Sequence, residues 1–223
     1  MRLRHNPEAR PELHAFEYFV DNPFECKGNW HSTFTAKQPL HLELGCGKGN
    51  FISVIAGSNP KINFLAIDIK SEVLVLAKRK VEEYYKKTGL PIQNILFAAQ
   101  DIERIDDIFA PEDTVDTIYI LFPNPWPKVR HKKRRLTHTR QLMKYRTFLK
   151  DEGLIHFKTD DTELFEESLL YFEEAGFEII FSTEDAHKEN ALPMDICTEH
   201  EEMFAGQGVA IKYMVAKKQR LPV

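Results

Sequence analysis

Short apolar runs alternate with longer amphipathic segments through most of this chain, and this alternation constrains the fold more than any other feature. The pattern predicts strands over 40–44, 63–67, 95–98, 117–122, 154–158, 177–183 and 208–216, and helices over 50–56, 71–87, 139–149 and 162–175. Strands that alternate with helices predict an α/β fold, with a mostly parallel sheet and helices on both faces. Ligands of such sheets bind beyond the carboxyl ends of the strands.

The length of 223 residues and the mass of 26.0 kDa fit one large domain. Residues 1–35 are polar, contain proline and carry scattered aromatic side chains. We expect them to form an arm whose first dozen residues are mobile and which becomes helical and packs near its end. Residues 36–223 then form a single domain.

Cysteine and hydropathy patterns indicate the cellular compartment. The three cysteines lie far apart without a C-x-x-C spacing, which predicts a reducing compartment without disulfides or a zinc site. The basic N-terminus is not followed by the apolar segment of a secretory signal. No run reaches the roughly 18 apolar residues of a membrane span. The nine histidines show no ligand spacing. We expect a cytoplasmic protein without a metal or a membrane association, and we leave its oligomeric state open.

Charge is unevenly distributed. From Thr117 to Lys150 there are ten Lys and Arg and no Asp or Glu, so with a net charge of −4 overall the rest of the chain carries −14. Such polarity predicts an acidic body that presents one cationic face, suited to a polyanionic partner.

A glycine-rich segment, Gly45-Cys46-Gly47-Lys48-Gly49, connects the first expected strand to a helix. A dinucleotide fingerprint, G-x-G-x-x-G, would need its third glycine at position 50, where this chain has Asn50. Glu43 also precedes the loop, where its carboxylate would repel a pyrophosphate but would suit an ammonium. The register therefore favours S-adenosylmethionine over NAD, which makes an NAD oxidoreductase the weaker alternative.

Two more acids follow the next two strands. Asp68 ends the second strand, where a carboxylate can accept both ribose hydroxyls of a nucleoside. Asp101 follows the third strand and is placed to accept the adenine amino group. Each feature also has a structural interpretation, since glycine loops pack tightly and strand-end aspartates cap helices. The three acids together favour the cofactor site.

The most specific segment runs from Leu121 to Leu136, with the sequence LFPNPWPKVRHKKRRL. Its three prolines stiffen a loop that holds Asn124 and Trp126 at the end of the fourth strand. Six cations follow between Lys128 and Arg135, enough to bind several phosphates. The alternatives are a solvated basic run and a nuclear localisation signal, and we expect nucleic-acid binding because the loop and the cations are joined in one segment.

From about Leu40 onward, the chain resembles the bacterial tRNA (guanine-N7)-methyltransferases, whose motifs are similar to LELGCGKG, FPDPWPKxRHxKRRL, HFKTD and TEYEE. The resemblance implies a seven-stranded class I methyltransferase (Rossmann-like) fold, S-adenosylmethionine as cofactor, and the variable-loop guanine of tRNA (tRNA position 46) as methyl acceptor. It places Glu43, Gly45, Gly47, Gly49, Asp68, Asp101 and Asn124 at cofactor-binding positions. It places Lys128, Arg130, His131, Lys132, Lys133, Arg134, Arg135, Asp160, Thr198 and Glu201 at substrate-binding positions.

Asn124 departs from the family pattern, which has an aspartate at this position that is called catalytic. Asparagine cannot act as a general base. Guanine N7, however, carries a lone pair and no proton, so its methylation needs alignment rather than deprotonation. We expect activity to persist, with Asn124 as the catalytic residue that orients groups by hydrogen bonding.

Two substrate positions have structural alternatives, and two further functions compete with the main one. Thr159-Asp160 can cap the helix that follows, and Thr198 to Glu201 fits a T-x-x-E capping box. A non-catalytic RNA-binding protein with a relic methyltransferase fold is conceivable because of Asn124, although the three acids count against it. An exocyclic-amine methyltransferase is suggested faintly by Asn124-Pro125-Trp126-Pro127, but that motif lacks the basic tail.

Overall fold

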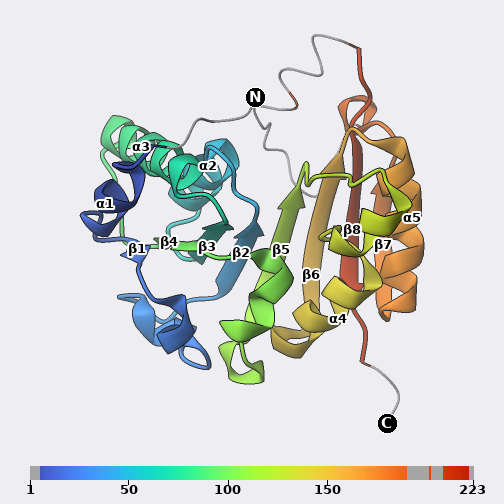
Figure 1. Cartoon of the computed structure of the whole chain (residues 1–223), viewed down its shortest axis with the longest axis horizontal. Coiled ribbons are helices and arrows are strands. Elements are labelled where there is room, and N and C mark those ends of the chain that lie inside the picture. The colour runs from blue at the N-terminus through green and yellow to red at the C-terminus, as the bar shows by residue number, and fades with distance from the viewer. Residues whose placement is uncertain (1–5, 190–200, 202–207, 221–223) are drawn as a thin grey trace. The chain divides into compact units, whose positions relative to one another are not determined.

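The computed structural model describes residues 6–189, 201 and 208–220. The chain forms two compact units, Met1–Asp113 and Thr114–Val223 (Figure 1). The single domain expected over residues 36–223 stays a prediction. Each unit is built from strands and helices around its own buried apolar residues.

The first unit contains four parallel strands in the order β1-β4-β3-β2. Their bounds are β1 (Phe19–Val20), β2 (Leu40–Leu44), β3 (Asn63–Asp68) and β4 (Ile95–Ala99). β3 is buried along almost its whole length because neighbours flank it on both edges. Central parallel strands of this kind are uniformly apolar, as the sequence Phe64-Leu65-Ala66-Ile67 illustrates.

Three α-helices belong to the first unit: α1 (Ala9–His14), α2 (Asn50–Ser58) and α3 (Ser71–Thr88). Gly89 ends α3 in a left-handed conformation with φ of 71°, as the Thr88-Gly89 sequence predicts. α2 and α3 pack against each other, and α1 packs against α3.

The N-terminal arm is more tightly packed than the sequence suggested. In α1, Ala9 and Leu13 are buried, and Glu12 accepts two hydrogen bonds from Arg79 of α3. The expectation of a mobile first dozen residues is therefore wrong for residues 9–12. The missed signal is the i, i+4 apolar pair of Ala9 and Leu13, which gives even a short helix one face to bury.

The second half of the arm is fixed by a buried carboxylate. Asp113, which is fully buried, accepts hydrogen bonds from the backbone amides of Gly28 (2.8 Å) and Trp30 (3.0 Å). The indole of Trp30 donates to the Ile108 carbonyl and stacks on Phe109. Short 3₁₀ turns connect these contacts: η1 (Pro23–Cys26), η2 (Trp30–Thr33), η3 (Ile102–Asp107) and η4 (Pro111–Asp113).

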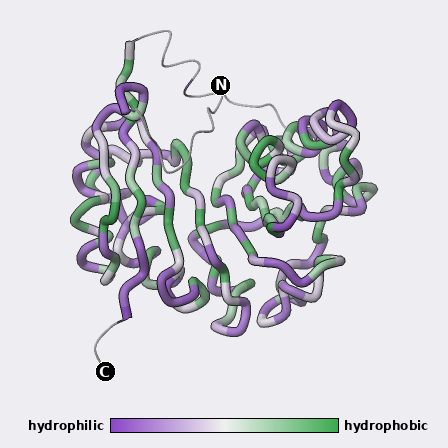
Figure 2. Tube along the Cα trace, turned by 180° about the vertical axis from the view of Figure 1, so that it is seen from behind, coloured by the Kyte–Doolittle hydropathy of each residue, from purple (hydrophilic) through white to green (hydrophobic). Residues whose placement is uncertain are grey.

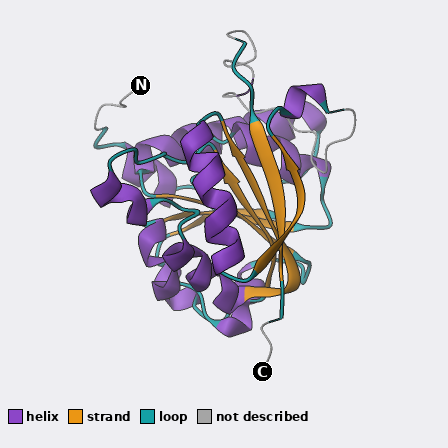
Figure 3. Ribbon diagram, turned by 90° about the vertical axis from the view of Figure 1, so that its right-hand side faces the viewer, coloured by secondary structure: helices purple, strands orange, loops and turns teal. Residues whose placement is uncertain are grey.

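The described residues of the second unit form four strands in the order β5-β6-β8-β7. They are β5 (Val115–Leu121), β6 (Leu149–Thr159), β7 (Phe177–Thr183) and β8 (Lys212–Lys218). β5 and β6 are parallel, whereas β8 runs antiparallel to both β6 and β7. Helices α4 (Thr139–Phe148) and α5 (Thr162–Glu174) pack on each other and on β6, and α5 also contacts β7 and β8 (Figure 3). The 3₁₀ turns η5 (Val129–Arg134) and η6 (Ala186–Lys188) complete the unit.

These elements confirm the α/β class and correct the strand count. The described residues contain eight strands rather than seven, because β1 adds a two-residue edge strand beside β4. Two residues are too few to show an alternating pattern in the sequence. The last strand begins at Lys212 rather than at Gly208. Hydrophobic residues follow the strands in Figure 2, while the loops are largely hydrophilic.

Candidate active site

The glycine loop turns sharply at the carboxyl end of β2. The amides of Gly45 and Cys46 both donate to the Ile67 carbonyl, at 2.8 and 3.1 Å, which holds the loop against the end of β3. Gly45 has a φ of 80°, and a Cβ added there would meet no atom within 4 Å. Position 45 therefore needs a glycine because of its left-handed backbone conformation and not because of crowding. The space beside it is open to a ligand.

Gly49 has a different role from Gly45. It is the left-handed N-cap of α2, and a Cβ added there would lie 2.6 Å from the Cα of Ala77 in α3. The third glycine of the motif thus allows two helices to approach closely. Gly47, the middle glycine of the motif, has a φ of 53°, and its backbone amide donates a hydrogen bond to Asp68.

Asp68 organises the carboxyl end of β3. Its Oδ2 accepts from the Gly47 amide at 3.2 Å, and its Oδ1 accepts from the Lys70 amide at 3.1 Å. Burial raises the pKa of this carboxyl, and the backbone hydrogen bonds oppose that rise. Each carboxylate oxygen has a second lone pair, so Asp68 can still accept from two hydroxyl groups.

Glu43 of β2 is a buried acid with an unsatisfied oxygen. Its side chain is 3% exposed, and within the described part of the chain its Oε2 has no hydrogen-bond partner. Desolvation, together with the negative charge of Asp68, raises its pKa well above the usual range. A carboxylate in this position calls for a cation, and the ammonium of S-adenosylmethionine meets that need. The residues present therefore fit this cofactor.

Asp101 follows β4, and its side chain acts as a helix cap, which is the structural interpretation given above for strand-end aspartates. Its side chain caps η3 by accepting from the Glu103 amide at 3.0 Å. The neighbouring Gln100 donates its backbone amide to the Asp68 carbonyl at 3.1 Å, which ties the two strand ends together. Capping and ligand binding are compatible because only one lone pair of the carboxylate is used.

Ile69 is a candidate that the sequence analysis missed. It directly follows Asp68, and its apolar side chain is 59% exposed. An apolar side chain left exposed beside a strand-end acid supplies a surface against which a flat base can pack. The only sequence signal is an apolar residue between the acid and the start of the next helix.

The proline-rich loop after β5 is strained. Phe122 and Trp126 have φ values of 51° and 43°, in the left-handed region that non-glycine residues avoid. Each such residue costs about 1–3 kcal/mol unless its surroundings hold it. The Oδ1 of Asn124 accepts from the Trp126 amide at 3.1 Å, which is one such support. Asn124 itself is exposed.

The basic run divides into two sets of side chains. Lys128, Arg130, Lys133 and Arg134 are exposed, and the Arg134 guanidinium lies 4.3 Å from the Trp126 ring centre. The ring of His131 is 5.7 Å from the same tryptophan ring. By contrast, Lys132 and Arg135 form ion pairs with the α5 side chains Glu163 and Glu167. Lys132 and Arg135 were both expected to contact tRNA, and in the structure both are paired with carboxylates of the same unit.

The remaining substrate candidates lie near the ends of β6 and α5. The cap of α5 is Asp161, which accepts from the Leu164 amide at 2.7 Å, so the suggestion that Asp160 caps this helix is wrong. The Asp160 carbonyl accepts from Lys212. Thr198 lies outside the described residues, so the capping box stays a prediction.

Glu201 forms a buried ion pair. It lies 2.8 Å from the Nζ of Lys158 in β6, and the two side chains are only 3% and 1% exposed. The Lys158 ammonium is also 5.3 Å from the centre of the Tyr213 ring. Removing the lysine would take the cation away from a buried carboxylate, at a cost of roughly 3–5 kcal/mol.

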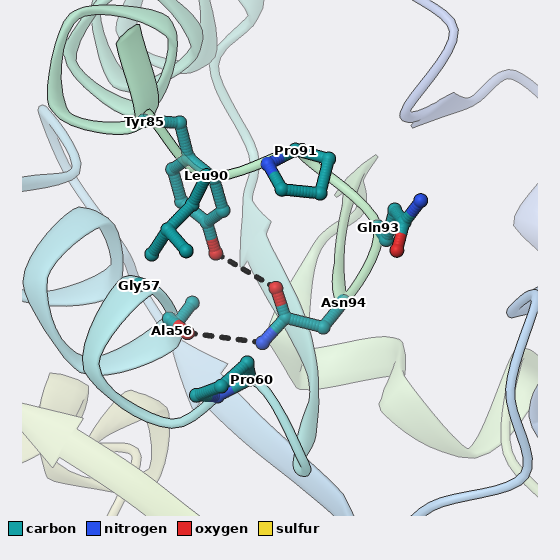
Figure 4. A pocket seen from close by; sticks show the side chains of 8 residues that line it. All are labelled: Ala56, Gly57, Pro60, Tyr85, Leu90, Pro91, Gln93 and Asn94. Carbon is teal, nitrogen blue, oxygen red and sulfur yellow. Dashed lines mark hydrogen bonds between the residues drawn. The ribbon is translucent and has the colours of Figure 1, made fainter. Parts of the chain in front are cut away.

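A separate pocket lies at the amino end of β4, away from the glycine loop (Figure 4). Asn94 satisfies its own polar groups there: its Oδ1 accepts from Tyr85, and its Nδ2 donates to the carbonyls of Ala56, Asn59 and Ile62. The buried amide of this pocket is therefore occupied, which indicates a structural clamp between α2, α3 and the start of β4.

The described residues contain no group of three or more His, Cys, Asp or Glu that could hold a metal ion. Within the same ranges, no helix is long and apolar enough to span a bilayer.

Comparison with known proteins places these features in a family. Residues 37–214 match the model of a family described as putative methyltransferase. The tRNA (guanine-N(7)-)-methyltransferase of Clostridium perfringens (strain 13 / Type A) is 57% identical over 98% of this chain and 100% of its own length. The protein of the same name from Ruminiclostridium cellulolyticum is 51% identical over 99% of this chain and 94% of its own length.

Solved structures agree on the fold. An antibiotic-related methyltransferase has a TM-score of 0.61 at 18% identity, covering 90% of this chain and 96% of its own. The 16S rRNA methyltransferase KamB also has a TM-score of 0.61, at 14% identity, covering 91% and 95%. Matches at this identity show the fold alone, and the full-length relatives show the family. The chain belongs to the tRNA (guanine-N7)-methyltransferase family and has a class I methyltransferase fold.

Proposed function

We propose that this protein transfers a methyl group from S-adenosylmethionine to N7 of guanine in tRNA, and that the acceptor is the variable-loop guanine at tRNA position 46. The observation that carries the proposal is the buried, unsatisfied Glu43 oxygen beside Asp68 and the glycine loop. It occurs in a chain that is 57% identical to a tRNA (guanine-N(7)-)-methyltransferase over nearly its full length. We place the activity in the cytoplasm, where the substrate is found.

The residues of the first unit would hold the donor. Glu43 pairs with the ammonium, Asp68 accepts from the ribose hydroxyls, and Asp101 accepts from the adenine amino group. Ile69 packs against the base, and the open space at Gly45 admits the ligand backbone. When bound, the sulfonium supplies an electrophilic methyl group.

The residues of the second unit would hold the RNA. Exposed cations of the basic run bind phosphates, while Asp160 and Thr198 contact the guanine. Glu201, which is buried against Lys158, would act from behind this site rather than by direct contact. Asn124 orients the reacting groups by hydrogen bonding and does not remove a proton, because N7 has none to lose. The chemical step then depends on alignment rather than on a general base.

The test is a product analysis. We would incubate the purified protein with an unmodified tRNA transcript and methyl-labelled donor, and then identify the modified nucleoside. A transcript in which guanine 46 is replaced by adenine is the matched control. We expect 7-methylguanosine from the first transcript only. Methylated exocyclic amines would identify the competing methyltransferase class, and tRNA binding without any product would identify an RNA-binding protein.

Position 124 provides the sharper version of this test. Asn124→Ala should lower kcat/KM by roughly ten- to a hundredfold, the effect of losing one or two orienting hydrogen bonds. Asn124→Asp should be at least as active as the wild type, because a carboxylate accepts the same bonds and favours the developing positive charge. If only Asn124→Asp makes 7-methylguanosine, the carboxylate is chemically necessary and the proposed activity of this chain is wrong.

A further inference from the structure

The basic turn η5 presents two faces with different partners. A 3₁₀ helix has three residues per turn, so residues three apart share a face. Lys132 of the turn and its C-cap Arg135, whose amide donates to the Lys132 carbonyl, pair with the carboxylates of α5, whereas Lys133 and Arg134 are exposed. All these side chains carry the same charge, and the pair formed by Lys132 and Arg135 faces the carboxylates of α5.

Arg135 is the most buried of these cations. Its side chain is 1% exposed, a degree of burial that excludes an RNA phosphate from its guanidinium. Its Nε donates to the Pro125 carbonyl at 2.7 Å, and its Nη1 donates to Glu167. The fork of the guanidinium therefore joins α5 to the backbone of the residue that follows Asn124.

Glu167 is the centre of this arrangement. It accepts from Lys132 and Arg135, and from the Tyr171 hydroxyl at 2.9 Å. Partial burial disfavours its charged form, but these donors outweigh burial and keep its pKa below the usual value. The carboxylate thus stays ionised and holds two cations of the turn against the helix.

The loop that Arg135 contacts needs such support. Phe122 and Trp126 are both left-handed, and they flank Pro123, Asn124 and Pro125. A strained conformation persists only where its surroundings over-determine it. Supports of the loop include the turn made by the Asn124 side chain, the hydrogen bond from the Phe122 amide to the Lys158 carbonyl, and the hydrogen bond from Arg135 to Pro125.

We infer that Arg135 and Glu167 are positioning residues: together they hold the Pro123–Pro127 loop, and Asn124 within it, in its reactive conformation. Arg135 then serves the reaction through geometry and not as a phosphate contact. The catalytic consequence rests on the proposed function, whereas the structural consequence for the loop does not.

The decisive variant is Arg135→Lys. A lysine keeps the positive charge, so a phosphate contact would survive this change. Its single nitrogen cannot occupy the positions of both Nε and Nη1, so the bridge between Pro125 and Glu167 would be lost. We expect kcat to fall by roughly ten- to a hundredfold, as for a small misplacement of a reacting group, with the salt dependence of tRNA affinity unchanged. Arg140→Lys, at an exposed position at the start of α4, is the matched control and should behave as wild type.

Glu167→Gln tests the other end of the bridge. The amide offers one accepting oxygen in place of two, so it cannot satisfy Lys132, Arg135 and Tyr171 together. It should reproduce the fall in kcat, whereas Glu166→Gln, which removes the same charge from an exposed neighbour, should not. In an Asn124→Ala background the effect of Glu167→Gln should shrink, because both changes act on one loop.

Hydrogen exchange separates this inference from the proposed function. The amides of Phe122, Asn124, Trp126 and Lys128, which are the non-proline residues of this segment, should exchange faster in Arg135→Lys and Glu167→Gln than in the controls, while those of β2 and α2 should not change. Faster exchange supports the inference even if no 7-methylguanosine forms, in which case the proposed function alone fails. Unchanged exchange, or an intact kcat in Arg135→Lys, would overturn it, and an intact kcat is the result expected of a phosphate contact that survives the change.

Discussion

At the scale of single residues, Glu43, the proposed partner of the donor's ammonium, destabilises the donor-free chain. Its buried carboxyl has a raised pKa, so in the donor-free chain ionisation opposes folding. The stability that the neutral form contributes is present below the ordinary pKa of 4.5 and is lost as pH rises through the folded-state value. An oxygen without a partner among the described residues agrees with this direction.

We therefore predict opposite effects from Glu43→Gln. At pH 7 the donor-free variant should be more stable than the wild type by about 0.5–2 kcal/mol, a usual gain from relieving a functional strain. Its affinity for S-adenosylmethionine should be weaker by roughly 1.5–3 kcal/mol, the value of a hydrogen bond to a charged group. Urea unfolding and calorimetry measure the two quantities. A donor-free variant less stable than wild type would mean that Glu43 already has a cationic partner.

Much of the donor side could be predicted from sequence at this scale. Glycines, strand-end acids and apolar runs are local patterns, so Glu43, Asp68 and Asp101 could be placed at adjacent strand ends without a structure. What could not be predicted was which lone pairs remain available. One lone pair of Asp101 accepts from the Glu103 amide, and Asp161 rather than Asp160 caps α5. Neither contact follows from residue type.

At the scale of elements, the basic turn η5 shows why composition is a poor guide to contacts. Six cations in eight residues predict a phosphate-binding surface, but the phase of a short 3₁₀ turn decides which of them face solvent. That phase depends on where Glu163 and Glu167 lie on α5, some thirty residues later in the sequence. From the sequence, all six cations were assigned to tRNA, because nothing local to the run shows that two of them pair with α5.

This division predicts which cations govern salt dependence. Lys133→Ala and Arg134→Ala should each reduce the slope of log affinity for tRNA against log salt by roughly 0.7–0.9, the value of one phosphate contact. Lys132→Ala removes the same charge from the face turned toward α5 and should leave the slope unchanged. Filter binding over a series of salt concentrations measures all three. Equal losses for Lys132 and Lys133 would show that the ion pairs with α5 open when tRNA binds.

At the scale of the whole molecule, the donor residues and the cationic segment belong to different compact units. Glu43, Asp68 and Asp101 are in Met1–Asp113, while the ten cations between Thr117 and Lys150 are in Thr114–Val223. Several of these ten serve the fold: Arg146 donates to two backbone carbonyls, and Lys150 pairs with Asp116. The cationic face is consequently smaller than the sequence count implies.

Donor binding should be visible in the stability of the full chain. A ligand at 100 times its Kd stabilises the folded state by about 2.7 kcal/mol, because it binds the native form alone. For a chain of this length each kcal/mol raises Tm by about 2–4 °C, so saturating S-adenosylmethionine should raise it by about 5–10 °C. Asp68→Ala should weaken binding by roughly 1.5–3 kcal/mol and, at the same donor concentration, lose more than half of that rise. Calorimetric scans with and without donor measure both shifts, and Lys133→Ala, which changes the basic turn η5, is the control that should keep the full rise. If Asp68→Ala retained the wild-type rise, the donor would bind without this carboxylate, and the assignment of the β2, β3 and β4 strand ends as the donor site would fail.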